Sequence, residues 1–222
     1  MTRDKLARMV GANAWYSFVC ALLRTTVYPM YGGVRAIGAE NVPMDGPVLL
    51  APVHFSNLDP PLVVIHQKRK VYVMAKEELL TAKGLGPILH SLDVFAVRRG
   101  TADTESVRRA ITLLEGGNVV LMFPEGTRGD GKSLLPLNAG VAMLAKKSGA
   151  KVVPIGIHGT QIVAPRVGKG RHHRMTIVYG EPFTFDEVAG EGNNAAQREQ
   201  FSAYLRKRLI ELCGEAGLEL GE

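Results

Sequence analysis

A histidine and an aspartate lie five residues apart in the stretch "HFSNLDPP" (54–61). His54 follows the apolar run 47–53, which predicts a buried strand, and Asp59 precedes two prolines, which favour the first turn of a helix. A carboxylate on one ring nitrogen would fix the tautomer and leave the other nitrogen free to take a proton from a hydroxyl group. The alternative is that Asp59 is only the N-cap of the helix and His54 a loop residue, and the spacing alone does not decide between them.

A second group of polar residues follows another apolar run in "MFPEGTRGDGK" (122–132). Backbone amides around Gly126 could face an anion, and the guanidinium of Arg128 could bind a phosphate through two parallel hydrogen bonds. The alternative is a tight turn with solvated charges. A carboxylate and a guanidinium directly after a buried strand are more than such a turn requires.

Strand and helix signals alternate from residue 47 onward and predict the scaffold for these residues. The sequence therefore predicts an α/β fold, with a mostly parallel central sheet and flanking helices. Ligands of such sheets bind at the carboxyl ends of the strands, where we expect His54, Arg98, Arg99 and Glu125 to meet. The expected strands are 47–53, 70–75, 93–99, 118–124, 151–159 and 174–180, and the expected helices are 60–67, 77–82, 86–92, 104–117, 138–149 and 194–214.

Four short blocks in this order resemble the motifs of the glycerolipid acyltransferase family: "HFSNLD", "VFAVRRG", "FPEGTR" and "VVPIGI" (152–157). The chain looks most similar to the 1-acyl-sn-glycerol-3-phosphate acyltransferase branch. This resemblance implies an enzyme that transfers a fatty acyl chain from a thioester donor to the free hydroxyl of lysophosphatidic acid, giving phosphatidic acid without an acyl-enzyme. The donor would be acyl-CoA or acyl carrier protein, and neither a cofactor nor a metal ion is expected.

The resemblance also implies a role for each motif residue. His54 would be the general base, and Asp59 would orient it and stabilise its charge. Arg98 and Arg128 would bind the phosphate of the acceptor. Glu125 and Gly126 would shape the phosphate site, and Thr127 would order the loop. The residues expected to shape the acyl or acceptor pocket are Val153, Pro154 and Ile155.

The chain departs from the family pattern at three places. Val53 stands where the family often has asparagine, Val97 where it often has aspartate, and "PLNAG" (136–140) where lysines are common. A supplementary cationic contact is therefore missing from the motif, and Arg99 or Lys132 could replace it. Such a change would alter acceptor preference, so glycerol-3-phosphate and other lysolipids are alternative acceptors.

The chain is basic, with a net charge of +6 and a pI of about 9.4. This balance favours a polyanionic partner, either nucleic acid, an anionic membrane or a phosphorylated substrate, or else only aids solubility. A basic nucleic-acid-binding α/β protein is the alternative from a different class, but it predicts aromatic residues interleaved with Lys and Arg. Aromatic residues make up only 6% of the chain and form no such block, so no nucleic-acid partner is expected.

A further basic cluster surrounds His172 and His173 in the stretch 166–175, which also contains three arginines and a lysine. It could bind lipid headgroups, the phosphates of coenzyme A or an acidic carrier protein, and a solvated basic loop is an equal alternative.

The N-terminal stretch 9–23 carries no charge, yet it is shorter than the roughly 20 residues of a membrane span. Helical periodicity places Trp15, Phe18, Val19 and Leu22 on one face, which is typical of a helix lying on a membrane surface. The alternatives are a helix packed on the protein's own core, a signal peptide or a single span.

We therefore expect two parts. Residues 1–35 would form an N-terminal amphipathic, membrane-associating helical segment, and residues 36–222 an acyltransferase α/β domain. The protein would be a peripheral or monotopic protein at the cytoplasmic face of the cell membrane, with an anionic phospholipid surface and a lysophospholipid acceptor as partners.

Overall fold

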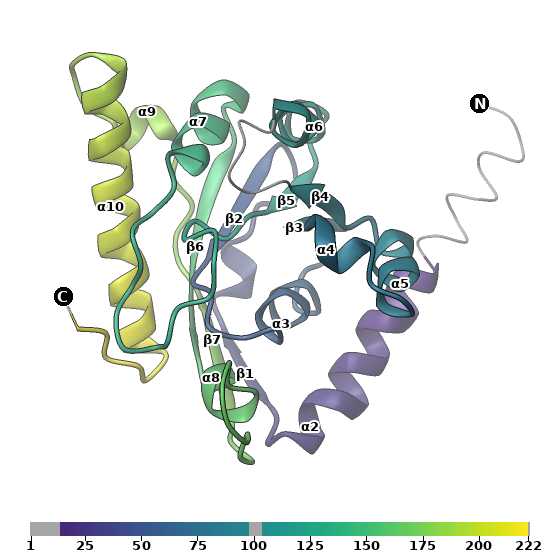
Figure 1. Ribbon diagram of the computed structural model, residues 1–222. Helices are drawn as coiled ribbons and strands as arrows, with labels where there is room; N and C mark the ends of the chain where they lie inside the picture. The colour runs from purple at the N-terminus through teal and green to yellow at the C-terminus, as the bar shows by residue number, and fades with distance from the viewer. Residues whose placement is uncertain (1–13, 98–103, 222) are drawn as a thin grey trace, which may run out of the picture.

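A seven-stranded sheet forms the centre of the computed structural model, which describes residues 14–97 and 104–221 (Figure 1). The strand order is β1-β7-β6-β2-β5-β3-β4, and neighbouring strands are parallel except for the antiparallel pair β6–β7. The predicted α/β class with a mostly parallel sheet is confirmed. The strands are β1 Val34–Ile37, β2 Val48–Pro52, β3 Val71–Lys76, β4 Phe95–Val97, β5 Val119–Leu121, β6 Lys151–His158 and β7 Met175–Tyr179.

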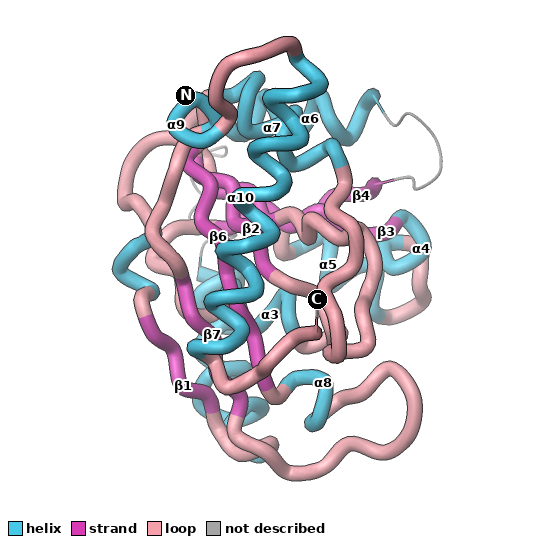
Figure 2. The backbone as a smooth tube through the Cα atoms, turned by 90° about the vertical axis from the view of Figure 1, so that its left-hand side faces the viewer, coloured by secondary structure: helices cyan, strands magenta, loops and turns pink. Residues whose placement is uncertain are grey.

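Helices cover both faces of this sheet, which is why its central strands are almost continuously apolar. All five residues of β2 are buried. Figure 2 shows α10 lying in front of the sheet, and α3 lies on the opposite face. The helices of the body are α3 Asp59–Val64, α4 Glu77–Leu80, α5 Leu85–Ser91, α6 Thr104–Glu115, α7 Ala139–Ser148, α8 Thr160–Val163, α9 Phe185–Val188 and α10 Asn194–Glu215, with a 3₁₀ turn η2 at Ala39–Asn41.

The packing of α10 on β6 requires a glycine at one point. A Cβ atom on Gly156 would lie 2.4 Å from the backbone of Leu212, so a side chain there would push the helix away from the sheet.

Two tyrosines hold α3 on the opposite face of the sheet. Tyr28 donates a hydrogen bond to the carbonyl of Leu58 and Tyr179 donates one to the carbonyl of Val63, each over 3.0 Å.

The N-terminal helix exposes three of the four apolar side chains that the sequence placed on one face. It covers residues 14–22 and continues as a π-helix, η1 Leu23–Val27, and a short α2, Tyr28–Met30. Trp15, Phe18 and Leu22 expose 43%, 57% and 45% of their surfaces. Within the described ranges, no helix has the length and apolar character that crossing a membrane requires.

The π-helical turn has a local cause. The hydroxyl of Thr25 donates to the carbonyl of Ala21 over 2.8 Å, and the hydroxyl of Thr26 donates to that of Leu22. These side chains compete with the backbone amides for the same carbonyls and so loosen the α-helical pattern.

All six predicted strands and all six predicted helices are present. The sequence interpretation missed β1, α8 and α9, which have only four residues each. The expected boundary between residues 35 and 36 falls inside β1. The division into two parts stays a prediction.

Candidate active site

Asp59 is the centre of a network at the carboxyl end of β2. Its side chain is fully buried, and one oxygen, Oδ2, accepts hydrogen bonds from the Nδ1 of His54 at 3.0 Å and from the amides of Phe55 and Ser56 at 2.7 Å each. Helix α3 begins at Asp59 with Leu58 as its N-cap and without a side-chain cap. The N-cap interpretation of Asp59 is therefore wrong, because its carboxylate binds the turn before the helix.

The ring of His54 is oriented by this carboxylate. Because a carboxylate only accepts hydrogen bonds, Nδ1 carries the ring proton in the neutral form, and Nε2 is left with a free lone pair. The ring also stacks on Phe123, with the two ring centroids 3.8 Å apart, and 12% of the histidine side chain is exposed. An oriented, slightly exposed imidazole of this kind can take a proton from a bound hydroxyl group.

The main chain of His54 is held by the loop that follows β5. Its amide donates to Oε1 of Glu125 over 2.8 Å, and its carbonyl accepts from the amide of Gly129 over 2.8 Å. The second oxygen of Glu125 accepts from the amide of Leu135 at 3.1 Å. His54 and Glu125 thus meet at the strand ends as predicted, because β2 and β5 are neighbours. Glu125 uses both oxygens to position the backbone.

Gly126 occupies a position that excludes other residues. Its φ is +66°, and a Cβ atom would lie 2.4 Å from Nδ2 of Asn138. Its amide donates to the carbonyl of Phe123 over 3.0 Å. The turn itself therefore uses this amide, and the expectation that the amides around Gly126 face an anion stays a prediction for its neighbours.

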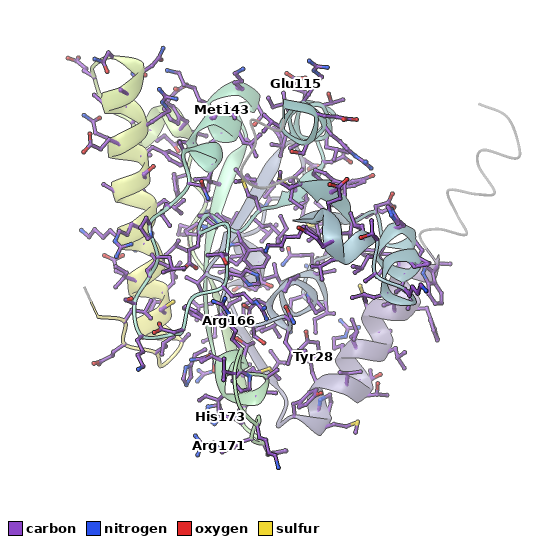
Figure 3. All side chains as sticks on the ribbon, in the orientation of Figure 1. Tyr28, Glu115, Met143, Arg166, Arg171 and His173 are labelled. Atoms are coloured by element: carbon purple, nitrogen blue, oxygen red, sulfur yellow. The ribbon has the colours of Figure 1, made fainter. Side chains whose placement is uncertain are left out.

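Arg128 is partly exposed, and its guanidinium makes no hydrogen bond or ion pair with another described residue. Thr127 beside it is exposed. The carbonyl of Arg128 accepts a hydrogen bond from Nη1 of Arg166 at 3.4 Å. Figure 3 shows Arg166 near the middle of the molecule, whereas Arg171 and His173 lie at its lower end. Only one part of the basic cluster therefore reaches the site.

The arginines Arg98 and Arg99 lie outside the described residues, directly after β4. Lys132, the other candidate for a supplementary cation, is exposed. Val53, which stands where the family often has asparagine, is fully buried, and its amide donates to the carbonyl of Ile155 over 3.0 Å.

Val153, Pro154 and Ile155 lie in β6 beside the last residues of β2, with Leu50, Ala51 and Pro52 as their register partners. All three side chains are buried. Because side chains alternate along a strand, Pro154 shares the α10 face with Gly156, and Val153 and Ile155 take the opposite face. These residues support the strand that leads to His54, and their role in shaping a pocket stays a prediction.

Three contacts of the site were not found from the sequence. Phe123 stacks on His54, Asn138 packs against Gly126, and Arg206 of α10 donates to the carbonyls of Leu134 and Leu135. Phe123 has a weak signal, as a large residue at the end of a strand. Asn138 and Arg206 reach the site only through tertiary packing. Within residues 14–97 and 104–221, no group of three His, Cys, Asp or Glu side chains is placed so that it could hold a metal ion.

A mostly parallel sheet with a hydrogen-bonded histidine–aspartate pair at its carboxyl end has the architecture of an α/β enzyme. Comparison with known proteins gives the family. The sequence pattern of the Acyltransferase family matches residues 33–158. The chain belongs to this family, in its 1-acyl-sn-glycerol-3-phosphate acyltransferase branch.

Three relatives illustrate this membership. The 1-acyl-sn-glycerol-3-phosphate acyltransferase of Bacillus subtilis (strain 168) is 31% identical over 168 residues, which are 75% of this chain and 81% of that protein. The human 1-acyl-sn-glycerol-3-phosphate acyltransferase alpha is 32% identical over 149 residues, 65% of this chain and 53% of that protein. The crystal structure of the 1-acyl-sn-glycerophosphate (LPA) acyltransferase PlsC from Thermotoga maritima has the same fold, with a TM-score of 0.77, 22% identity and coverage of 100% of this chain and 86% of that one.

Burial raises the pKa of Glu125 to about 7, although the amides of His54 and Leu135 lower it. The folded protein therefore keeps a proton on Glu125 between about pH 4.5 and 7, which the unfolded chain releases. Stability should fall as the pH rises through this window, since the folded state binds more protons there.

We predict that Glu125→Gln removes this dependence, because glutamine does not ionise. Denaturant unfolding at several pH values should show the variant gaining stability relative to the wild type as the pH rises, by at most about 1.4 kcal/mol per pH unit. The control is Glu191→Gln, at an exposed position, and its free energy of unfolding should depend on pH in the same way as that of the wild type. If the stability of Glu125→Gln changed with pH in parallel with that of the wild type, the raised pKa of Glu125 would be contradicted.

Proposed function

We propose that this enzyme transfers a fatty acyl group from a thioester donor to the free hydroxyl of lysophosphatidic acid, giving phosphatidic acid. The observation that carries the proposal is the hydrogen bond from Nδ1 of His54 to Asp59, which leaves Nε2 free. The names of the relatives point to the same acceptor. Acyl-CoA and acyl carrier protein are the two candidate donors.

In the proposed reaction, Nε2 of His54 takes the proton of the acceptor hydroxyl while its oxygen attacks the thioester carbonyl. The tetrahedral intermediate collapses, the carbon–sulfur bond breaks, and the thiolate leaves with the proton from the imidazolium. Asp59 stabilises the imidazolium during these steps. Ser56 is buried and donates its hydroxyl to the carbonyl of Ala164 over 2.8 Å, which supports direct transfer without a serine ester.

We predict that His54→Ala reduces acyl transfer by about 10²–10⁴-fold while the protein stays folded, because general-base catalysis is worth about that much. Thiol release from acyl-CoA should be measured with lysophosphatidic acid, other lysophospholipids and glycerol-3-phosphate as acceptors. His90→Ala, which changes a histidine in α5, is the control and should retain activity. Near-normal turnover of a folded His54→Ala protein would contradict the general-base role.

The phosphate of the acceptor is proposed to bind Arg128, with Arg98 as a second cation. A phosphate monoester carries nearly two negative charges, and a planar guanidinium can donate two parallel hydrogen bonds to it. The absence of a described partner for the Arg128 guanidinium supports this proposal.

We predict that Arg128→Ala lowers kcat/KM for lysophosphatidic acid by about 10- to 100-fold, the value of a hydrogen-bonded charge at about 1.5–3 kcal/mol. Most of the change should lie in the KM of the acceptor, and Arg128→Lys should recover part of it. The KM of the acyl donor serves as the internal control. An unchanged acceptor KM and kcat/KM would remove Arg128 from the phosphate site.

Attachment at the cytoplasmic face of the membrane is proposed to use the outward face of the N-terminal helix. Trp15 donates its indole N–H to the hydroxyl of Ser91 over 2.9 Å, so α5 lies beside this face. There α5 adds the exposed Leu85 and Ile88. Apolar side chains on two neighbouring helices can enter the interface together.

We predict that changing Trp15, Phe18 and Leu22 to serine strongly weakens cosedimentation with anionic vesicles, because each buried large apolar side chain contributes up to about 1.5–3 kcal/mol. Met44 and Val167, which are also exposed, are the sites for control serine substitutions. Vesicle binding that is equal in the triple variant and the control would contradict this membrane face.

A further inference from the structure

A cavity of about 380 Å³ lies between the N-terminal helix and the segment that joins α3 to β3. It is separate from the candidate active site, because neither His54 nor Asp59 lines it and the Glu125–Arg128 loop does not reach it. Its walls come from two segments, with Tyr16, Ser17, Cys20, Ala21 and Arg24 on one side and Ile65, Gln67, Lys68, Arg69 and Lys70 on the other.

The lining contains four cationic side chains and no acidic one. Two of the four are committed elsewhere. The guanidinium of Arg69 donates to the carbonyls of Pro43, Gly46 and Gly117, and Lys70 forms an ion pair with Asp93.

The other two cations, Arg24 and Lys68, are exposed and make no ion pair or hydrogen bond with any residue in the described part of the chain. They lie on opposite walls of the cavity, one on the N-terminal helix and one on the segment after α3. Two such charges beside a cavity favour an anion, and the volume is within the range of pockets for small ligands.

The position of the cavity indicates the source of the anion. Ser17, Cys20 and Arg24 lie on the side of the helix opposite to the exposed Trp15, Phe18 and Leu22. When the apolar side of such a helix enters the membrane interface, its polar side lies at the level of the lipid headgroups.

We propose that this cavity binds the phosphate-bearing headgroup of an anionic phospholipid, with Arg24 and Lys68 as its cationic contacts. This site goes beyond the proposed reaction, because the bound lipid is a component of the membrane surface and is not acylated there. The inference rests on the proposed membrane contact of the helix and does not depend on which acceptor is acylated.

Cys20 provides a direct test, because it lines the cavity and is partly exposed, whereas Cys213, the other cysteine, is buried. The rate of alkylation of Cys20 in the full-length protein should be followed by mass spectrometry. Dihexanoyl phosphatidylglycerol, dihexanoyl phosphatidylcholine and inorganic phosphate are the added ligands, with both lipids kept below their micelle-forming concentrations.

We expect phosphatidylglycerol to slow the alkylation of Cys20 several-fold in a saturable way, and phosphatidylcholine and inorganic phosphate to have much weaker effects. The protection should disappear in the variant Arg24→Gln/Lys68→Gln. It should persist in Arg108→Gln/Lys147→Gln, a control that removes two exposed positive charges from α6 and α7, which Figure 1 shows far from the N-terminal helix.

Failure to protect Cys20, or equal protection in the cavity variant, would overturn the proposal. Equal protection by inorganic phosphate would overturn the lipid assignment in favour of the free anion. Because alkylation is measured without substrate, these outcomes are independent of whether His54 acts as the general base.

Discussion

The three hydrogen bonds to one oxygen of Asp59 are the interaction on which the site depends. Because the ring of His54 and the amides of Phe55 and Ser56 converge on Oδ2, the ring has one position relative to the turn. The other oxygen, Oδ1, is buried and has no hydrogen-bond partner among the described residues. In the proposed reaction, this buried carboxylate is the group that would lie beside the imidazolium of His54.

The rest of the fold keeps this turn in place from two directions. Glu125 and Gly129 hold the main chain of His54 from the loop after β5, at the strand end next to β2. Tyr28 and Tyr179 hold the helix that carries Asp59, because their hydroxyls bind carbonyls at its two ends. A displacement of either partner would lengthen the hydrogen bond between the ring and the carboxylate. The bond between His54 and Asp59 keeps its length only if the backbone on both sides is fixed. The side chains of Glu125, Tyr28 and Tyr179 bind this backbone.

Residues of the candidate site that directly follow a strand could be predicted from the sequence. Contacts that depend on how distant segments pack together could not. The runs that form β2, β5 and β6 are apolar because both faces are covered, so the meeting of His54 and Glu125 could be predicted from their positions directly after such strands. That Glu125 binds two amides could not, since the amide of Leu135 reaches it from ten residues further along the same loop, and the path of that loop was not predicted. The stacking of Phe123 on His54 likewise joins two segments that are far apart in the sequence. Short elements such as β1 carry too few residues for a periodic signal.

The N-terminal helix joins the expected membrane surface to the active site. Tyr28, the first residue of α2 in this segment, is 1% exposed and donates its hydroxyl to the carbonyl of Leu58, the residue before Asp59. Burial, with the charge of Asp59 as a smaller cause, raises the pKa of Tyr28, so the hydroxyl keeps its proton and remains a donor. Removing the whole segment would open the core beside Asp59 and leave a carbonyl without its partner. Membrane contact and the order of the catalytic turn can therefore be separated only by substitutions on the outward face, where Trp15 lies.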